Sequence, residues 1–135
     1  MISVSDGMNF SYLIPASAHA AGAEGTSWVT DVVLHDPGSI TAVGGLSFHE
    51  KDRDNTSADS EAVLVGHGYS LMLDDVVEDT FGEDSSSGAI RVSSDQPLVV
   101  SSRTYNNAAE GTFGQYVPGL PESEAIEVGE EVRLI

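Results

Sequence analysis

Four residues of this sequence combine charge and an aromatic ring in a way that suits ligand recognition: Asp31, Arg91, Arg103 and Tyr105. Arg103 and Tyr105 are two positions apart, so a β-strand places both on one face. Alternation also puts Arg91 on the polar side of the preceding strand, which we expect to be a neighbour. A planar guanidinium beside an aromatic ring suits sugar hydroxyls, a carboxylate or an ion pair between subunits. An internal salt bridge, for instance Arg103 with Asp31, is the alternative interpretation.

The histidines are the next candidates, because metal binding and acid–base chemistry both use them. A zinc site needs three or four converging ligands. We expect segments 28–35 and 43–50 to form a hairpin, which separates His35 from His49 by roughly 20 Å at ~3.3 Å per residue. We therefore expect surface or turn histidines, no metal site and no cofactor. The four histidines are His19, His35, His49 and His67.

The polar segment 51–60 has the composition of a calcium-binding loop, with three aspartates and an asparagine between Asp52 and Asp59. An EF-hand loop needs glycine at its sixth position and glutamate at its twelfth. Counted from Asp52, Ser57 and Val63 stand at those positions. We favour a solvated acidic loop, with a calcium site of another type as the alternative.

Catalytic motifs are missing from the sequence. The adjacent carboxylates Asp74 and Asp75 precede a predicted helix, where capping and the helix dipole explain them. No serine stands in a Gly-x-Ser-x-Gly motif, and Gly66-His67-Gly68 lacks the further glycine and the helix of a phosphate-binding loop. The sequence therefore predicts that this protein is not an enzyme.

The net charge limits the possible partners. Asp and Glu number 22 against 5 Lys and Arg, which gives a formal net charge of −17 over 135 residues. Nucleic acids and anionic lipid headgroups attract basic patches, so we expect neither nucleic acid binding nor membrane insertion. An acidic, lysine-poor surface suits a salty environment, where screening weakens self-repulsion, so we expect a halotolerant source. The chain has no cysteine and no run approaching ~18 apolar residues, and from its first residues we expect no signal peptide within this sequence.

Short β-rich runs separated by Gly, Pro, Asn, Asp and Ser must position these residues. Leu46 and Phe48 alternate with polar neighbours, as do Ile90 and Val92, a period typical of antiparallel sheets with one buried face. We predict a single all-β domain over residues 1–135. It is an antiparallel β-sandwich, immunoglobulin-like or similar, with about eight strands, one short helix and Trp28 in its core. The predicted strands are 10–14, 28–35, 43–50, 61–65, 69–73, 89–93, 98–106, 112–117 and 131–135.

The segment 74–82 predicts the one short helix. An aspartate stands at its N-cap and Gly82 at its C′ position. Val77 and Phe81, four residues apart, give it one apolar face. We expect this helix to close an open end or side of the sandwich.

The sequence resembles an uncharacterised module common in secreted and surface bacterial proteins. The motifs that carry the resemblance occur in the expected order: 14–31 (IPASAHAAGAEGTSWVTD), 36–38 (DPG), 73–75 (LDD), 81–82 (FG), 87–92 (SGAIRV), 102–106 (SRTYN) and 111–115 (GTFGQ). This resemblance implies a secreted or cell-surface context. A more distant resemblance, carried by 33–38 (VLHDPG) and 94–103 (SDQPLVVSSR), is to the sensory rhodopsin transducer family. That family implies a β-sandwich that assembles as an oligomer and binds carbohydrate or another small ligand.

Two functions follow as hypotheses. The first is a non-catalytic binding module for carbohydrate or another extracellular polymer, with Asp31, Arg91, Arg103 and Tyr105 at its site. The second is a structural or interaction module whose partner is protein, including copies of itself in a homo-oligomer. An aromatic surface beside an arginine would favour the first, and a stable oligomer without a small-ligand response would favour the second.

Overall fold

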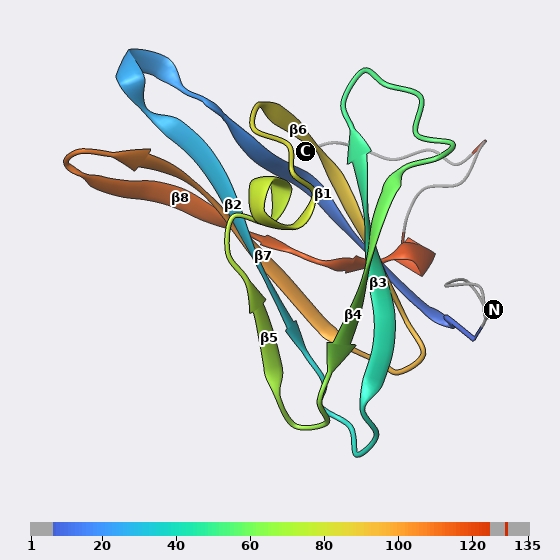
Figure 1. The fold of residues 1–135 in the computed structure, drawn as a ribbon. Coiled ribbons are helices and arrows are strands. Elements are labelled where there is room, and N and C mark those ends of the chain that lie inside the picture. The colour runs from blue at the N-terminus through green and yellow to red at the C-terminus, as the bar shows by residue number, and fades with distance from the viewer. Residues whose placement is uncertain (1–6, 125–128, 130–135) are drawn as a thin grey trace.

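The computed structural model describes residues 7–124 and 129, and its nine strands form an antiparallel β-sandwich (Figure 1). This confirms the predicted all-β fold. All eight strands predicted within the described residues are present, whereas the predicted strand 131–135 lies outside them. The strands are β1 (Phe10–Ala21), β2 (Ser27–His35), β3 (Ala42–Glu50), β4 (Asp59–Val65), β5 (Ser70–Leu73), β6 (Ser86–Ser94), β7 (Val99–Ala108), β8 (Gly111–Pro118) and β9 (Leu120–Pro121).

The strand β1 belongs to both layers of the sandwich. The strand order is β4-β3-β6-β1-β2-β7-β8, with β5 paired to β2 and β9 to β1. From Phe10 to His19 the strand β1 pairs with β6, and from His19 to Ala21 it pairs with β2. Its register shifts between Ile14 and Ser17, which is the mark of a β-bulge. The bulge bends the strand, so that one continuous sheet folds over a single core.

The core is built by period-two alternation. Val32 and Leu34 of β2 and Ile90 and Val92 of β6 are fully buried, while the residues between them are more exposed. Burial of a side chain of this size contributes about 1.5–3 kcal/mol. All the buried apolar residues except Val29 form one cluster: Ile14, Val32, Leu34, Ala42, Leu46, Phe48, Val65, Val76, Val77, Ile90, Val92, Leu98, Val100 and Val117.

The predicted hairpin between 28–35 and 43–50 is wrong. Strand β2 pairs with β1, β5 and β7, and β3 pairs with β4 and β6. The turn that begins at Asp36 carries the chain from one layer to the other instead of reversing it. The backbone of Asp36 bonds to the β4–β5 connection, donating to Tyr69 and accepting from Gly68, and its buried carboxylate accepts the N–H of Gly38.

The predicted helix is a single turn of π-helix, η2 (Val76–Thr80), which buries Val76 and Val77 in the core. Phe81 follows it and stacks on Phe48 at 5.5 Å between ring centroids, and Gly82 has the expected positive φ of 74°. The other helical segments are short 3₁₀ turns, η1 (Ala23–Gly25) and η3 (Glu122–Glu124). Among the described residues, no helix has the length and apolar character needed to cross a bilayer.

The capping role predicted for the aspartate pair is wrong. Asp75 stands at the N-cap of η2, but its backbone is left-handed with φ 45° and ψ 57°. In this conformation its side chain makes no cap hydrogen bond to the helix. The carboxylate is directed to His19 of β1 instead.

Candidate functional site

Three of the four predicted ligand residues meet on one face of the β2–β7 pair. Asp31 and Arg103 are directly opposite each other in the register. The guanidinium of Arg103 lies 4.5 Å from the ring centroid of Tyr105, and Tyr116 of β8 is the next residue across the sheet. Together these four residues form what we call the arginine face: Asp31, Arg103, Tyr105 and Tyr116.

The hydrogen bonds of the arginine face differ from the predicted salt bridge. The guanidinium of Arg103 donates to the hydroxyl of Thr112 at 2.9 Å and makes no ion pair with Asp31, although both residues are described. Tyr105 donates its hydroxyl to Asp31 at 3.4 Å. Burial is the largest effect that raises the pKa of Tyr105, and the negative charge of Asp31 is the second largest. The tyrosine and the aspartate therefore form the polar pair that links β7 to β2.

Arg91 does not belong to this site. Its strand β6 pairs with β1 and β3, so it lies in the opposite layer from β7. The guanidinium of Arg91 forms an exposed ion pair with Glu122 instead. The predicted adjacency failed because the turn at Asp95–Pro97 crosses between layers, and consecutive strands in the sequence are then not neighbours.

Trp28 is exposed, which corrects its predicted place in the core. It retains 39% of its surface and forms a row across the sheet with Asn106 and Phe113. The next row is Thr30, Thr104 and Gln115. We call these six residues the aromatic face, and by alternation it lies on the other side of the sheet from the arginine face. Figure 1 shows the β1–β2 and β7–β8 hairpins that carry it projecting from the body of the sandwich.

The aromatic face is hollowed into a groove of about 410 Å³. Phe113 on its rim is 67% exposed. The hydroxyl of Thr30, fully buried, accepts the N–H of Ala18 at 2.8 Å and shares a hydrogen bond of 2.8 Å with Thr104. The groove is therefore mostly apolar, and its lining includes the hydroxyl of Thr104, which Thr30 holds from below. Its lining residues are Ala16, Trp28, Thr104, Phe113, Gly114, Gln115 and Val117.

Asn106, between the two aromatic rings in the register, carries an unpaired acceptor. Its side-chain oxygen is buried and has no hydrogen-bond partner among the described residues. A buried polar atom without a partner costs about 1–3 kcal/mol, so native structures keep few of them. The Asn106 oxygen lies in the row of Trp28 and Phe113 on the aromatic face, and the other such atom among the described residues is Oδ2 of Asp36.

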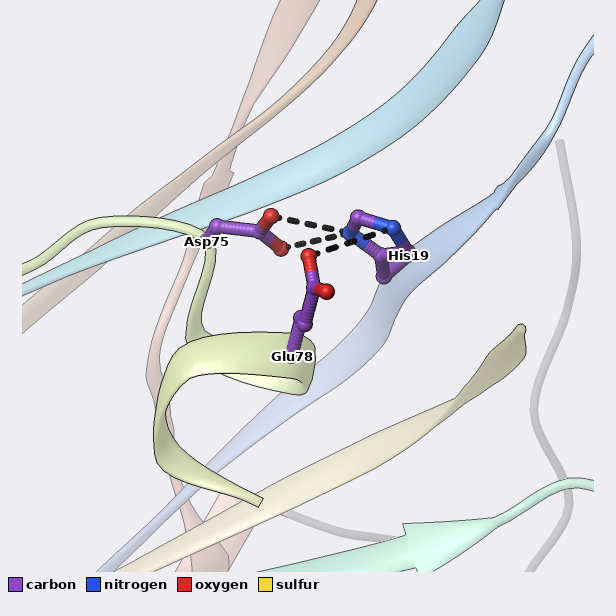
Figure 2. A group of neighbouring side chains, drawn as sticks. All are labelled: His19, Asp75 and Glu78. Atoms are coloured by element: carbon purple, nitrogen blue, oxygen red, sulfur yellow. Dashed lines mark hydrogen bonds and ion pairs between the residues drawn. The ribbon is translucent and has the colours of Figure 1, made fainter. Parts of the chain in front are cut away.

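His19 forms a second polar cluster beside the arginine face (Figure 2). Its Nδ1 lies 2.9 Å from both carboxylate oxygens of Asp75, and its Nε2 lies 3.4 Å from Glu78. The backbone N–H of Asp75 donates to Asp31 at 2.9 Å, which connects the cluster to the arginine face. The hydrogen bond to the Asp75 carboxylate is the largest cause that raises the pKa of His19, and burial opposes it.

Sequence reasoning missed this cluster because its members are far apart in the chain. His19 was expected at the surface or in a turn, but it lies on β1 with 22% of its side chain exposed. Asp75 follows 56 positions later. The one available signal was the adjacency of two carboxylates at 74–75, which helix capping had seemed to explain.

The acidic loop 51–60 is ordered by its own hydrogen bonds. Asp54 accepts both the N–H and the hydroxyl of Thr56, and these two bonds lower the pKa of its carboxyl. Arg53 pairs with Glu50, and Asn55 bonds to the Glu50 backbone. In the described part of the chain, no three metal-ligating side chains of this loop converge. This geometry agrees with a solvated loop.

Comparison with known proteins bears on the fold alone. No family model matches the sequence, and no curated protein matches it. Among solved structures, the crystal structure of Thermotoga maritima 1070 is similar, with a TM-score of 0.67. The match covers 82% of this chain and 91% of that chain at 15% sequence identity. The protein therefore shares its sandwich fold with Thermotoga maritima 1070.

Proposed function

We propose that this protein is a non-catalytic binding module that holds a neutral carbohydrate on its aromatic face. The observation that carries the proposal is the groove between Trp28 and Phe113, where two exposed rings flank amide and hydroxyl groups. Binding sites for small ligands are concave and mostly apolar, with a few placed polar groups. The apolar C–H faces of a sugar pack on aromatic rings, while its hydroxyls need hydrogen-bond partners.

The polar atoms of the groove suit sugar hydroxyls. Gln115 and Thr104 line it, and each offers both a donor and an acceptor. The unpaired oxygen of Asn106 lies in the row between the two rings. A ligand with several hydroxyl groups can satisfy the polar atoms of Gln115 and Thr104 together, because each hydroxyl both donates and accepts.

The charge of the chain favours an uncharged ligand. At a net charge of −17 the protein repels anionic polymers. Of the few basic residues, Arg53 and Arg91 are in ion pairs, and Arg103 lies over a tyrosine ring on the opposite face. None of these three arginines lines the groove. A neutral oligosaccharide therefore fits better than an acidic one.

Trp28 is the single tryptophan of the chain, so its fluorescence reports on the groove directly. We expect a neutral oligosaccharide from a soluble panel, in high salt, to shift the emission of Trp28 and raise the melting temperature. Phe113→Ala should remove both responses. Tyr116→Ala, on the arginine face, is the matched control and should keep them. A flat response across the panel, or loss only in the Tyr116 variant, would contradict the proposal.

A second candidate function, protein assembly, is favoured by the composition of β8. This strand is one end of the described sheet, and its eight residues include no charged side chain although the chain is strongly acidic. Phe113 and Tyr116 on it are 67% and 65% exposed. The other end strand, β4, carries Asp59 and Glu61. An uncharged edge strand is a template for pairing with another chain, and natural proteins commonly protect edges with charges.

Light scattering separates the two functions. If β8 mediates assembly, the protein is an oligomer at low concentration, and Tyr116→Lys converts it to the monomer because a charge opposes edge pairing. Leu64→Lys, on the opposite end strand, is the matched control and should leave the oligomer intact. A monomer at all concentrations would exclude assembly through β8.

A further inference from the structure

We propose that His19, Asp75 and Glu78 form a binding site for a divalent transition-metal ion of the Zn²⁺ class. The three side chains come from separate parts of the chain: β1, the turn before η2, and η2 itself. Figure 2 shows them converging on one point from these three directions. Convergence of an imidazole and two carboxylates is what such an ion requires from a protein.

The distances allow one ion to reach all three side chains. One ligand atom from each residue can be chosen so that all lie within 4.8 Å of one another. Zinc bonds to nitrogen and oxygen are about 2.0–2.2 Å, so two ligand atoms on one ion are about 2.9 Å apart at a right angle and about 3.4 Å apart at the tetrahedral angle. The 2.9 Å from Nδ1 of His19 to Asp75 lies in this range. The 3.4 Å to Glu78 is measured from the other ring nitrogen, Nε2, so the partly exposed Glu78 must turn to bind the same ion as the nitrogen beside Asp75.

The charge around the cluster favours a cation. Neither Asp75 nor Glu78 has a lysine or arginine partner among the described ion pairs, and His19 is the partner of both. Asp31 accepts the N–H of Asp75, and Asp84 also acts on His19 through its charge. Even a protonated imidazole therefore leaves the cluster negative. A divalent ion would neutralise this excess and take the place of a proton on the ring nitrogen of His19 that it binds.

The cluster is organised before any ion binds. Asp75 is held in the left-handed region, which a non-glycine residue occupies at some cost in energy. Its N–H is fixed by Asp31 on β2, while His19 is fixed by the pairing of β1 with β2 and β6. Two of the three ligands are thus placed by the sheet, and the partly exposed Glu78 can adjust.

The ligand set indicates the class of ion. Carboxylate and carbonyl oxygens suit Mg²⁺ and Ca²⁺, whereas imidazole suits Zn²⁺ and its neighbours in the first transition row. One imidazole and two carboxylates make three protein ligands, which leave a coordination position for water. The alternative, a simple ion pair of protonated His19 with the two carboxylates, predicts no metal binding at all.

A titration of the whole chain with the metal alone tests the proposal. The protein is treated with EDTA, exchanged into buffer with excess Mg²⁺ to occupy weak carboxylate sites, and titrated with Zn²⁺ by calorimetry. We expect one ion per chain, a higher melting temperature, and a visible absorption band when Co²⁺ replaces Zn²⁺. Each of His19→Gln and Glu78→Gln should weaken Zn²⁺ binding at least tenfold, because each removes one ligand.

The controls separate this site from other acidic groups. Asp79→Asn changes the neighbour of Glu78 on the same helical turn, and His49→Gln removes a histidine of the opposite layer; both should bind Zn²⁺ like the unmodified chain. Circular dichroism checks that each variant folds. If His19→Gln does not fold, the result for the surface variant Glu78→Gln decides the test. No binding, or equal binding by the Glu78 variant, would overturn the proposal and leave an ion pair only. This test does not depend on the carbohydrate proposal.

Discussion

One face of the β2–β7 pair is buried at one end of the two strands and partly exposed at the other. At one end Val32, Leu34 and Val100 are buried in the common core. At the other end, on the aromatic face, Trp28 remains well exposed and Thr30 is held by hydrogen bonds. The difference comes from what covers the face, because the layer that contains β3 and β6 closes over the first end. One pair of strands therefore contributes to the core at one end and leaves an open groove at the other, where we propose that a ligand binds.

The largest effect should come from removing apolar volume at the core end. Leu34 is fully buried, so Leu34→Ala should lower the free energy of unfolding by about 2–5 kcal/mol. Phe113→Ala removes a larger side chain from the aromatic face, but it should change the free energy of unfolding by about 0.5 kcal/mol or less. Urea unfolding of both variants measures the contrast. Equal losses would show that the aromatic face is part of the core.

A smaller loss should follow from deleting the buried hydroxyl of the aromatic face. Thr30→Val keeps the shape but leaves the N–H of Ala18 without its acceptor, which should cost about 1–3 kcal/mol. Thr104→Val should cost less, because Thr30 then still accepts the N–H of Ala18. Urea unfolding measures the loss of free energy of unfolding in both variants. An equal loss, or a larger loss in Thr104→Val, would mean that Thr104 holds this end of the sheet together.

The smallest effect concerns pH and distinguishes the His19 cluster from the core. In metal-free protein the hydrogen bond that the protonated His19 ring donates to Asp75 raises the pKa of His19 above its usual value of 6.5. Its contribution to stability is therefore complete below pH 6.5 and is lost as the pH rises through the folded-state pKa. The difference in melting temperature between the unmodified chain and His19→Gln should shrink from pH 6 towards pH 9 in EDTA. The loss caused by Leu34→Ala should stay constant over this range.

The strands could be predicted because their signal is local. Alternation in β3 and β6 can be recognised from a few neighbouring residues. The turn residues at the ends of the strands are likewise recognised from a short stretch of sequence. The end of β1 was missed because its second half, beyond Pro15, consists largely of alanine and other small residues. Local patterns therefore specify which segments form β-strands, but they carry little information about which layer of the sandwich each strand joins.

The site was only partly predictable for the same reason. The shared face of Asp31, Arg103 and Tyr105 was predicted because two of them alternate on one strand and the third lies on its true neighbour. Arg91 was expected on a strand next to Arg103, and this adjacency is wrong because the turn before β7 changes layers. Asp75 and His19 depend on contacts between β1 and the η2 turn, and no short sequence pattern records such a contact.

The double pairing of β1 has a consequence for the order of events when the chain folds. Its partner β6 is among the later strands, and the hydroxyl of Tyr12 accepts the N–H of Leu98, which is 86 positions away. Pairings of such long range must close large loops first, and β-sandwiches dominated by them fold in milliseconds to seconds. During synthesis β1 and β2 must wait until β6 and β7 have emerged. Their apolar residues are exposed to aggregation throughout that interval.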